Sequence, residues 1–105
     1  MAQRGEIWSR RASGGVPGDL VLIISDNRIN DGTDFVICLL VTMTHYGLSY
    51  HIEIPPGQSG QADPAYIQCD EIYKSPSHWL AHRQGAVARD TMRRVERCLQ
   101  DLLDL

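Results

Sequence analysis

The sequence has no long hydrophobic run and few cysteines. Its longest apolar stretch, Phe35 to Val41, is far shorter than the ~20 residues that a membrane-spanning helix needs. No secretory signal precedes the first strand-like segment. The three cysteines, Cys38, Cys69 and Cys98, show no C-x-x-C spacing, so we interpret them as buried apolar side chains in a reducing compartment. We therefore expect a protein of the cytoplasm with no membrane anchor.

The sequence also lacks an excess of positive charge. Ten basic residues, nine of them Arg, stand against thirteen acidic residues, which gives a net charge of −3. Any surface that binds nucleic acid must therefore be local. A length of 105 residues, with 43% hydrophobic and 22% charged residues, is typical of one globular domain, and we expect residues 1–105 to form a single domain.

Five segments have the pattern of β-strands. They are Arg4 to Arg11, Asp19 to Ser25, Phe35 to Met43, Ser49 to Ile54 and Ala65 to Lys74. In the fourth segment apolar residues alternate with His51 and Glu53, which predicts that these two side chains face outward. The polar segments 26–34 and 55–64 are expected to be loops.

The last part of the chain changes to a helical period. Apolar residues recur every three or four positions at Met92, Val95, Leu99, Leu102 and Leu103. This spacing predicts an amphipathic helix, with the oxygens of Asp90 and Thr91 suited to its start. Strands followed by one helix predict a mostly β protein, a small barrel or curled sheet with a helix packed on it.

Three familiar kinds of site find no support in the sequence. His78 and His82 have the spacing of a zinc pair on a helix, but no third ligand completes a site, so we expect a surface turn and no metal. Ser59 lacks the G-x-S-x-G pattern of serine hydrolases. The glycines Gly14 and Gly15 lead into a strand, so no helix start is available to hold the phosphate of a nucleotide cofactor. We expect no cofactor.

Arginines and hydroxyl side chains at the ends of strands are better candidates for a phosphate-binding site. Arg10 and Arg11 precede a glycine-rich loop, and Arg28 lies in the following turn. Guanidinium groups bind phosphate through two parallel hydrogen bonds, although exposed arginines of this kind are also common on surfaces that bind nothing. Thr42, followed by Thr44, His45 and Tyr46, closes an apolar strand. The alternative is that the two threonines are present only because they favour strands.

Five short motifs, in the correct order along the chain, resemble those of the MazF/PemK family of bacterial toxins. They are Arg4-Gly5-Glu6-Ile7-Trp8, Leu22-Ile23-Ile24-Ser25-Asp26-Asn27, Leu39-Leu40-Val41-Thr42, Gln68-Cys69-Asp70-Glu71-Ile72, and Gly85-Ala86-Val87 with Thr91-Met92 and the leucines from Leu99 to Leu105. The resemblance covers nearly the whole chain.

The resemblance implies a fold, an activity and partners. The fold is an SH3-like barrel of about five to seven strands with a C-terminal helix, here assembled as a homodimer. The activity is a sequence-selective endoribonuclease that cleaves single-stranded RNA without metal and is neutralised by a cognate antitoxin. In the family an Arg at the start of the second strand and a Thr at the end of the third serve the cleavage. Thr42 matches the Thr, but the position of the Arg falls on Asp19-Leu20 or, with a shifted gap, on Val16-Pro17.

The missing Arg matters because RNA cleavage through the 2′-OH places extra negative charge on phosphorus. The reaction needs a group that takes the 2′ proton, one that protonates the leaving 5′ oxygen, and positive donors. Our hypothesis is that Arg10 or Arg11 supplies the charge while the Thr42 hydroxyl positions the phosphate. His45 is a further candidate, for proton transfer, and the alternative for it is an exposed loop histidine.

RNA binding at such a site would depend on stacking as much as on charge. We expect Tyr46 and Tyr50 to stack on bases, and Arg28 and Thr44 to contact the RNA. The loops Ser13 to Gly18 and Pro55 to Pro64 are expected to close over RNA or to receive an antitoxin segment that folds on binding.

Two other functions fit the same barrel. The missing Arg favours a protein that acts only by binding another protein, either an inactive relative or a gyrase-poisoning toxin of the CcdB type. The other alternative is a structural SH3-like adaptor without toxin activity.

Overall fold

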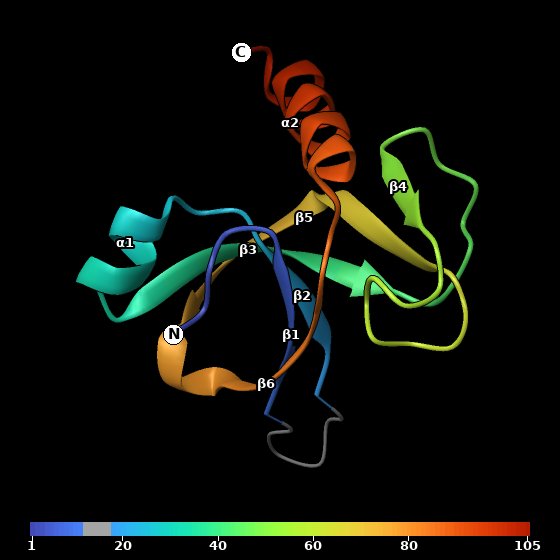
Figure 1. The fold of residues 1–105 in the computed structure, drawn as a ribbon. Coiled ribbons are helices and arrows are strands. Elements are labelled where there is room, and N and C mark those ends of the chain that lie inside the picture. The colour runs from blue at the N-terminus through green and yellow to red at the C-terminus, as the bar shows by residue number, and fades with distance from the viewer. Residues whose placement is uncertain (12–17) are drawn as a thin grey trace.

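The computed structural model describes residues 1–11 and 18–105 (Figure 1). The predicted loop at residues 13–18 therefore lies outside the described residues, apart from Gly18. In chain order the elements are β1 (Glu6–Arg10), β2 (Leu20–Ile23), α1 (Asn27–Gly32), β3 (Phe35–Thr42), β4 (His51–Ile54), β5 (Ala65–Pro76), the 3₁₀ helix η1 (Ser77–Trp79), β6 (Leu80–Ala86) and α2 (Arg89–Leu103). The strands form one six-stranded sheet in the order β4-β5-β3-β2-β1-β6, and every pair is antiparallel.

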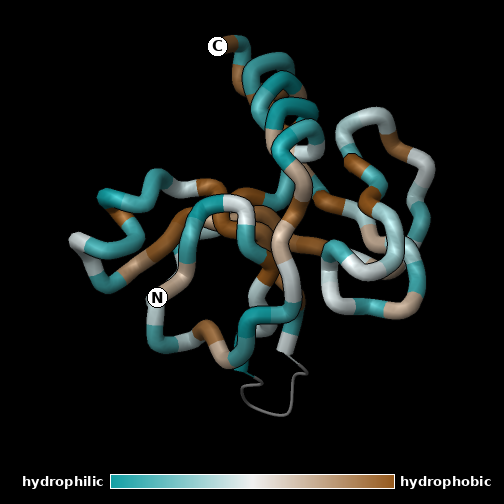
Figure 2. Tube along the Cα trace, in the orientation of Figure 1, coloured by the Kyte–Doolittle hydropathy of each residue, from teal (hydrophilic) through white to brown (hydrophobic). Residues whose placement is uncertain are grey.

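The sheet has an apolar core on each face, because its central strands are apolar at almost every position. Figure 2 shows the hydrophobic residues gathered along these strands. One cluster contains Ile7, Leu22 and Leu39, all fully buried, and the other contains Val21 and Cys38. Neighbouring residues of one strand contribute to opposite clusters, as the alternation of side chains in a strand requires.

Two glycines let the two edges of the sheet approach each other. Gly60 lies in the β4–β5 loop with a φ of +77°, and a side chain there would overlap the carbonyl oxygen of Gln84 in β6. A side chain on Gly85 would overlap the carbonyl oxygen of Gln58. The loop therefore packs backbone against backbone on the edge strand β6. This contact curls the sheet into the predicted small barrel, whose six strands fall within the predicted five to seven.

Helix α2 packs one face on the sheet and exposes the other. Val95 is fully buried in the first core cluster, whereas Leu102 and Leu103 are 41% and 51% exposed. The helix begins at Arg89 after Ala88, and no side-chain oxygen caps it, so the capping role predicted for Asp90 and Thr91 is wrong. Asp90 still places a negative charge in the first turn, where the helix dipole favours it. No helix in residues 1–11 and 18–105 has the length and apolar character needed to cross a membrane.

Three elements were missed in the sequence analysis, the short 3₁₀ helix η1 among them. Residues 26–34, predicted as a loop, contain the short helix α1, which begins with a hydrogen bond from the Arg28 amide to the Asp26 carboxylate. Asn30 is its one buried residue, and its side-chain amide donates a hydrogen bond to the Ser25 carbonyl. Residues 80–86 form the edge strand β6, which pairs with β1. His78 lies in η1 and His82 in β6, so the two histidines occupy different elements and do not share a helix.

Candidate active site

Three strands bring Arg10, Asp19 and Thr42 into one row across the sheet. The Arg10 amide donates a 2.8 Å hydrogen bond to the carbonyl of Asp19 at the open end of the β1–β2 pair. On the other side Leu20 pairs with Val41, so the preceding Asp19 lies opposite Thr42. Side chains that lie directly opposite each other in a sheet point to the same face. The strand register therefore places Arg10 and Thr42 on one face of the sheet, two strands apart.

The guanidinium of Arg10 is held by the Asp19 carboxylate. Nε donates to Oδ1 and Nη2 donates to Oδ2, both at 2.7 Å, and the Arg10 side chain is only 16% exposed. These hydrogen bonds raise the pKa of Arg10, so the group stays charged and cannot serve as a base. Its Nη1 makes no hydrogen bond with any residue that the structure describes, which leaves donors for another acceptor.

Thr42 presents its hydroxyl as a donor. The Thr44 amide donates a 3.1 Å hydrogen bond to Thr42 Oγ1. Because this bond occupies a lone pair of the oxygen, the O–H proton remains available for an acceptor such as a phosphate oxygen. The backbone amide of Thr44 therefore helps to orient the Thr42 hydroxyl.

A pocket of about 350 Å³ lies over the β4–β5 pair. It is lined by His45, Gly47, Leu48, Ser49, His51, Glu53, Tyr66 and Arg94, and we call it the β4–β5 pocket. Tyr66 is the direct partner of Thr42 in the β3–β5 pair. The rings of His45 and Tyr66 stack with centroids 5.0 Å apart and planes 12° apart. The predicted proton-transfer residue His45 is thus held one strand away from Thr42.

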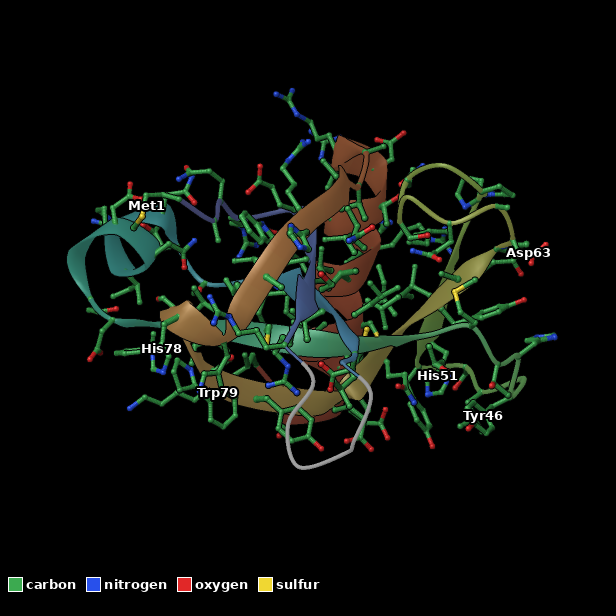
Figure 3. The ribbon with its side chains drawn as sticks, turned by 90° about the horizontal axis from the view of Figure 1, so that it is seen from below. Met1, Tyr46, His51, Asp63, His78 and Trp79 are labelled. Atoms are coloured by element: carbon green, nitrogen blue, oxygen red, sulfur yellow. The ribbon has the colours of Figure 1, made fainter. Side chains whose placement is uncertain are left out.

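His51 forms the inner wall of this pocket, contrary to the prediction that it faces outward. Its side chain is only 4% exposed, and Nε2 lies 3.5 Å from Asp70 Oδ1. The rings of Tyr46 and Tyr50 contact it edge-on, with centroids 5.8 and 5.4 Å away. Figure 3 shows the side chains of Tyr46 and His51 together, at the end of the molecule away from His78 and Trp79. The β4–β5 pairing and these aromatic rings cover the imidazole, which alternation along β4 alone did not reveal.

The two other predicted arginines, Arg11 and Arg28, are exposed. Arg28, on α1, is 91% exposed and pairs with Asp26 at 3.0 Å. In Figure 1, α1 adjoins the start of β3, whereas Thr42 ends that strand. Arg11 follows the last residue of β1, is exposed, and donates its amide to the Trp79 carbonyl. The strand register puts Arg10 on the same face as Thr42, whereas Arg28 lies on α1, near the opposite end of β3.

The sequence model of one protein family matches residues 3–103 of the chain. That family is described as the PemK-like, MazF-like toxin of type II toxin-antitoxin systems. The chain belongs to this family. The resemblance stated from the five motifs is thereby confirmed. No curated protein matches the sequence of this toxin.

Solved structures of similar fold include three relatives of this toxin. An endoribonuclease in complex with its cognate antitoxin, from Mycobacterial species, has a TM-score of 0.86 and 23% identity, covering 100% of this chain and 97% of that one. The Mycobacterium tuberculosis toxin MazF-mt6 has a TM-score of 0.83 and 18% identity, and the match covers 97% of this chain and 98% of that one. A MazE-MazF structure from Deinococcus radiodurans has a TM-score of 0.84 and 18% identity, and the match covers 99% of this chain and 96% of that one. These likenesses confirm the predicted fold.

Several residues at the site of this toxin were absent from the predicted set. Among them are Asp19 as the partner of Arg10, and Glu53, Tyr66 and Arg94 as walls of the β4–β5 pocket. Tyr66 could have been found from the alternation along its segment, because it precedes the buried Ile67. The other three depend on contacts between strands, or between strand and helix, that no local pattern specifies. Among residues 1–11 and 18–105, no three His, Cys, Asp or Glu side chains gather as a metal site.

Proposed function

We propose that this toxin is an endoribonuclease that cleaves single-stranded RNA through the 2′-OH and needs no metal. The observation that carries the proposal is the cross-strand row. It places the Arg10 guanidinium, held by Asp19, on the same face as the Thr42 hydroxyl. Arg10 thus supplies the positive charge that the family places at the start of the second strand, where this chain has Asp19.

The chemistry assigns a different task to each group. The 2′ oxygen attacks phosphorus and loses its proton, the bond from phosphorus to the 5′ oxygen breaks, and that oxygen gains a proton. The products are a 2′,3′-cyclic phosphate and a 5′-hydroxyl. Arg10 and the Thr42 O–H donate to the phosphate oxygens as charge builds up, and His45 transfers a proton, for which an imidazole is suited near neutral pH.

The comparisons favour this function over the binding-only alternatives. One relative reported above is described as an endoribonuclease and others as MazF. No feature of the described residues specifically supports gyrase poisoning or a structural adaptor. The charged guanidinium of Arg10 and the oriented hydroxyl of Thr42, on one face of the sheet, are groups that stabilise charge on a reacting phosphate.

Cleavage by the purified protein tests the proposal. The protein is incubated with a mixed-sequence single-stranded RNA in the presence of EDTA, and the new ends are mapped. We expect cyclic phosphate and 5′-hydroxyl ends. A Thr42→Val protein purified in parallel controls for contaminating nuclease and should lose the activity. Absence of cutting, or cutting only after a divalent metal is added, would contradict the proposal.

We further propose that the toxin is a cytoplasmic homodimer that a cognate antitoxin neutralises. The leucines near the end of α2 support a contact between copies, because Leu102, Leu103 and Leu105 are 41%, 51% and 85% exposed. One of the similar structures is an endoribonuclease in complex with its cognate antitoxin, and another contains MazE with MazF. Arg28, Tyr46 and Tyr50 remain proposed contacts for a longer RNA or for the antitoxin segment. Sedimentation equilibrium should report twice the chain mass, and a monomer at micromolar concentration would contradict the dimer.

A further inference from the structure

The β4–β5 pocket lies where the nucleotide next to the scissile phosphate would go. Tyr66 pairs directly with Thr42, and Glu53 pairs directly with Tyr66, so all three side chains lie on one face. Neighbouring strands are about 4.8 Å apart. The pocket therefore begins one strand away from the hydroxyl that is proposed to hold the phosphate, on the side opposite Arg10.

The walls of the pocket have the chemistry of a base-binding site. The stacked rings of His45 and Tyr66 offer an aromatic platform, and bases stack on such rings. Glu53 adds an exposed carboxylate, which only accepts hydrogen bonds, and Arg94 adds a guanidinium, which only donates them. The volume of about 350 Å³ is enough for one base with part of its ribose.

A second, independent observation points to a ligand at this place. His51 lines the pocket with a side chain that is 4% exposed. Its Nδ1 is shielded and has no hydrogen-bond partner among the described residues. Buried polar atoms of native proteins usually have a partner. The unpaired nitrogen thus belongs to a buried side chain in the wall of the pocket.

The donor and acceptor pattern selects among the bases. Guanine presents two adjacent donors, N1–H and the N2 amino group, that one carboxylate can accept together, and an O6/N7 edge that suits a guanidinium. Adenine and cytosine present an acceptor where guanine has N1–H, and a carboxylate repels it. Uracil offers a single donor, N3–H.

We propose that the β4–β5 pocket binds a guanine base flanking the cleaved phosphate, with Glu53 and Arg94 reading its edges and the His45–Tyr66 pair stacking on its face. This inference rests on the proposed function and adds the base specificity of the same site. It makes Glu53 a specificity-determining residue rather than a catalytic one.

A binding experiment tests the pocket without cleavage. ¹⁵N-labelled protein is titrated with guanosine 5′-monophosphate and, separately, with adenosine 5′-monophosphate. We expect the guanine nucleotide to shift the amide resonances of Glu53, Tyr66 and Arg94 at concentrations at which the adenine nucleotide does not. The Glu53→Gln protein should lose this difference. Equal shifts with both nucleotides, or shifts confined to another surface, would overturn the proposal.

A cleavage experiment tests the same residue in the reaction. Sequencing of the cut ends should show guanine enriched at one fixed position beside the cut. Glu53→Gln should lower kcat/KM for guanine-containing RNA about 10- to 100-fold, the range for loss of a two-bond base contact, and should narrow the preference for guanine over adenine. The matched control is Glu96→Gln, on α2, whose carboxylate pairs with Arg4 at 2.8 Å outside the pocket; it should cut like the wild type.

The outcomes separate the two proposals. If no RNA is cut, the proposed function fails, while the nucleotide titration still reports on the pocket. If RNA is cut with no base enriched beside the cut and the two nucleotides bind alike, only the guanine pocket fails.

Discussion

At the residue scale, the Glu6 carboxylate ties the start of β1 to the edge strand β6. Burial alone would raise its pKa, but hydrogen bonds from the Gln3 amide, Trp8 and Arg83 outweigh burial and lower the pKa. Two of these bonds are short, 2.7 Å from the Gln3 amide and 2.6 Å from Arg83 Nε. The side chain is 16% exposed, so water competes little for the carboxylate.

The lowered pKa of Glu6 makes its contribution to stability depend on pH. Because the folded pKa lies below the unfolded value near 4.5, the stabilisation is complete above that value and is lost as the pH falls through the folded pKa. Glu6→Gln should therefore reduce the free energy of unfolding by about 1–2 kcal/mol at pH 7, and by progressively less as the pH falls below 4.5. Urea unfolding at several pH values measures this. A loss of unfolding free energy that stays constant with pH would contradict this role of Glu6. Asp101→Asn, at an exposed position of α2, is the control.

Burial also decides which thiols of the toxin react. It raises the pKa of Cys38 to about 11. Burial, together with a hydrogen bond involving Cys98, raises the pKa of Cys69 well above its ordinary value. Only the thiolate is an effective nucleophile. A disulfide reagent at pH 8 should therefore titrate at most one thiol quickly, that of the partly exposed Cys98, and all three in denaturant. Rapid reaction of Cys38 in the native protein would show that the core is not packed as described.

At the scale of elements, the contact between the β4–β5 loop and β6 depends on glycine. A side chain on Gly85 would overlap the carbonyl oxygen of Gln58, which is backbone and cannot move aside cheaply. Gly85→Ala should therefore lower the free energy of unfolding by about 1–3 kcal/mol. Gly32→Ala is the matched control, since nothing lies within 4 Å of its added carbon. Equal stability of the two variants in thermal unfolding would show that the loop does not close the barrel.

The elements that the sequence predicted are those with a strong pattern of their own. β2 and β3 are continuous apolar runs, and α2 has a clear helical period, so each was found within a few residues of its observed bounds. β6 has no buried residue and forms because β1 offers an unpaired edge. α1 has a single buried residue, Asn30, and is fixed by hydrogen bonds to Ser25 and Asn27. Contacts with other parts of the fold determine both β6 and α1, so a local sequence pattern cannot predict these elements.

At the scale of the whole molecule, the site joins residues that are distant in the chain. Thr42 was found from a motif, and Arg10 from its position beside a loop. Their placement on one face of the sheet depends on the register across β1, β2 and β3, which the structure supplies. The β4–β5 pocket could not be predicted, because it requires β4, β5 and α2 to meet. The long-range pairing of strands therefore creates both the proposed phosphate site and the proposed base site.

The central claim is that Arg10 and Thr42 act on one phosphate. A double-mutant cycle of Arg10→Ala and Thr42→Val, read out as the single-turnover cleavage rate of a single-stranded RNA, tests it most directly, with Arg97→Ala, at an exposed position of α2, as the charge control. Each single substitution should slow cleavage about 10²- to 10³-fold. The double variant should be much less impaired than the product of the two, because the groups work as a unit. Fully multiplicative effects, or cleavage unchanged in either single variant, would contradict the account.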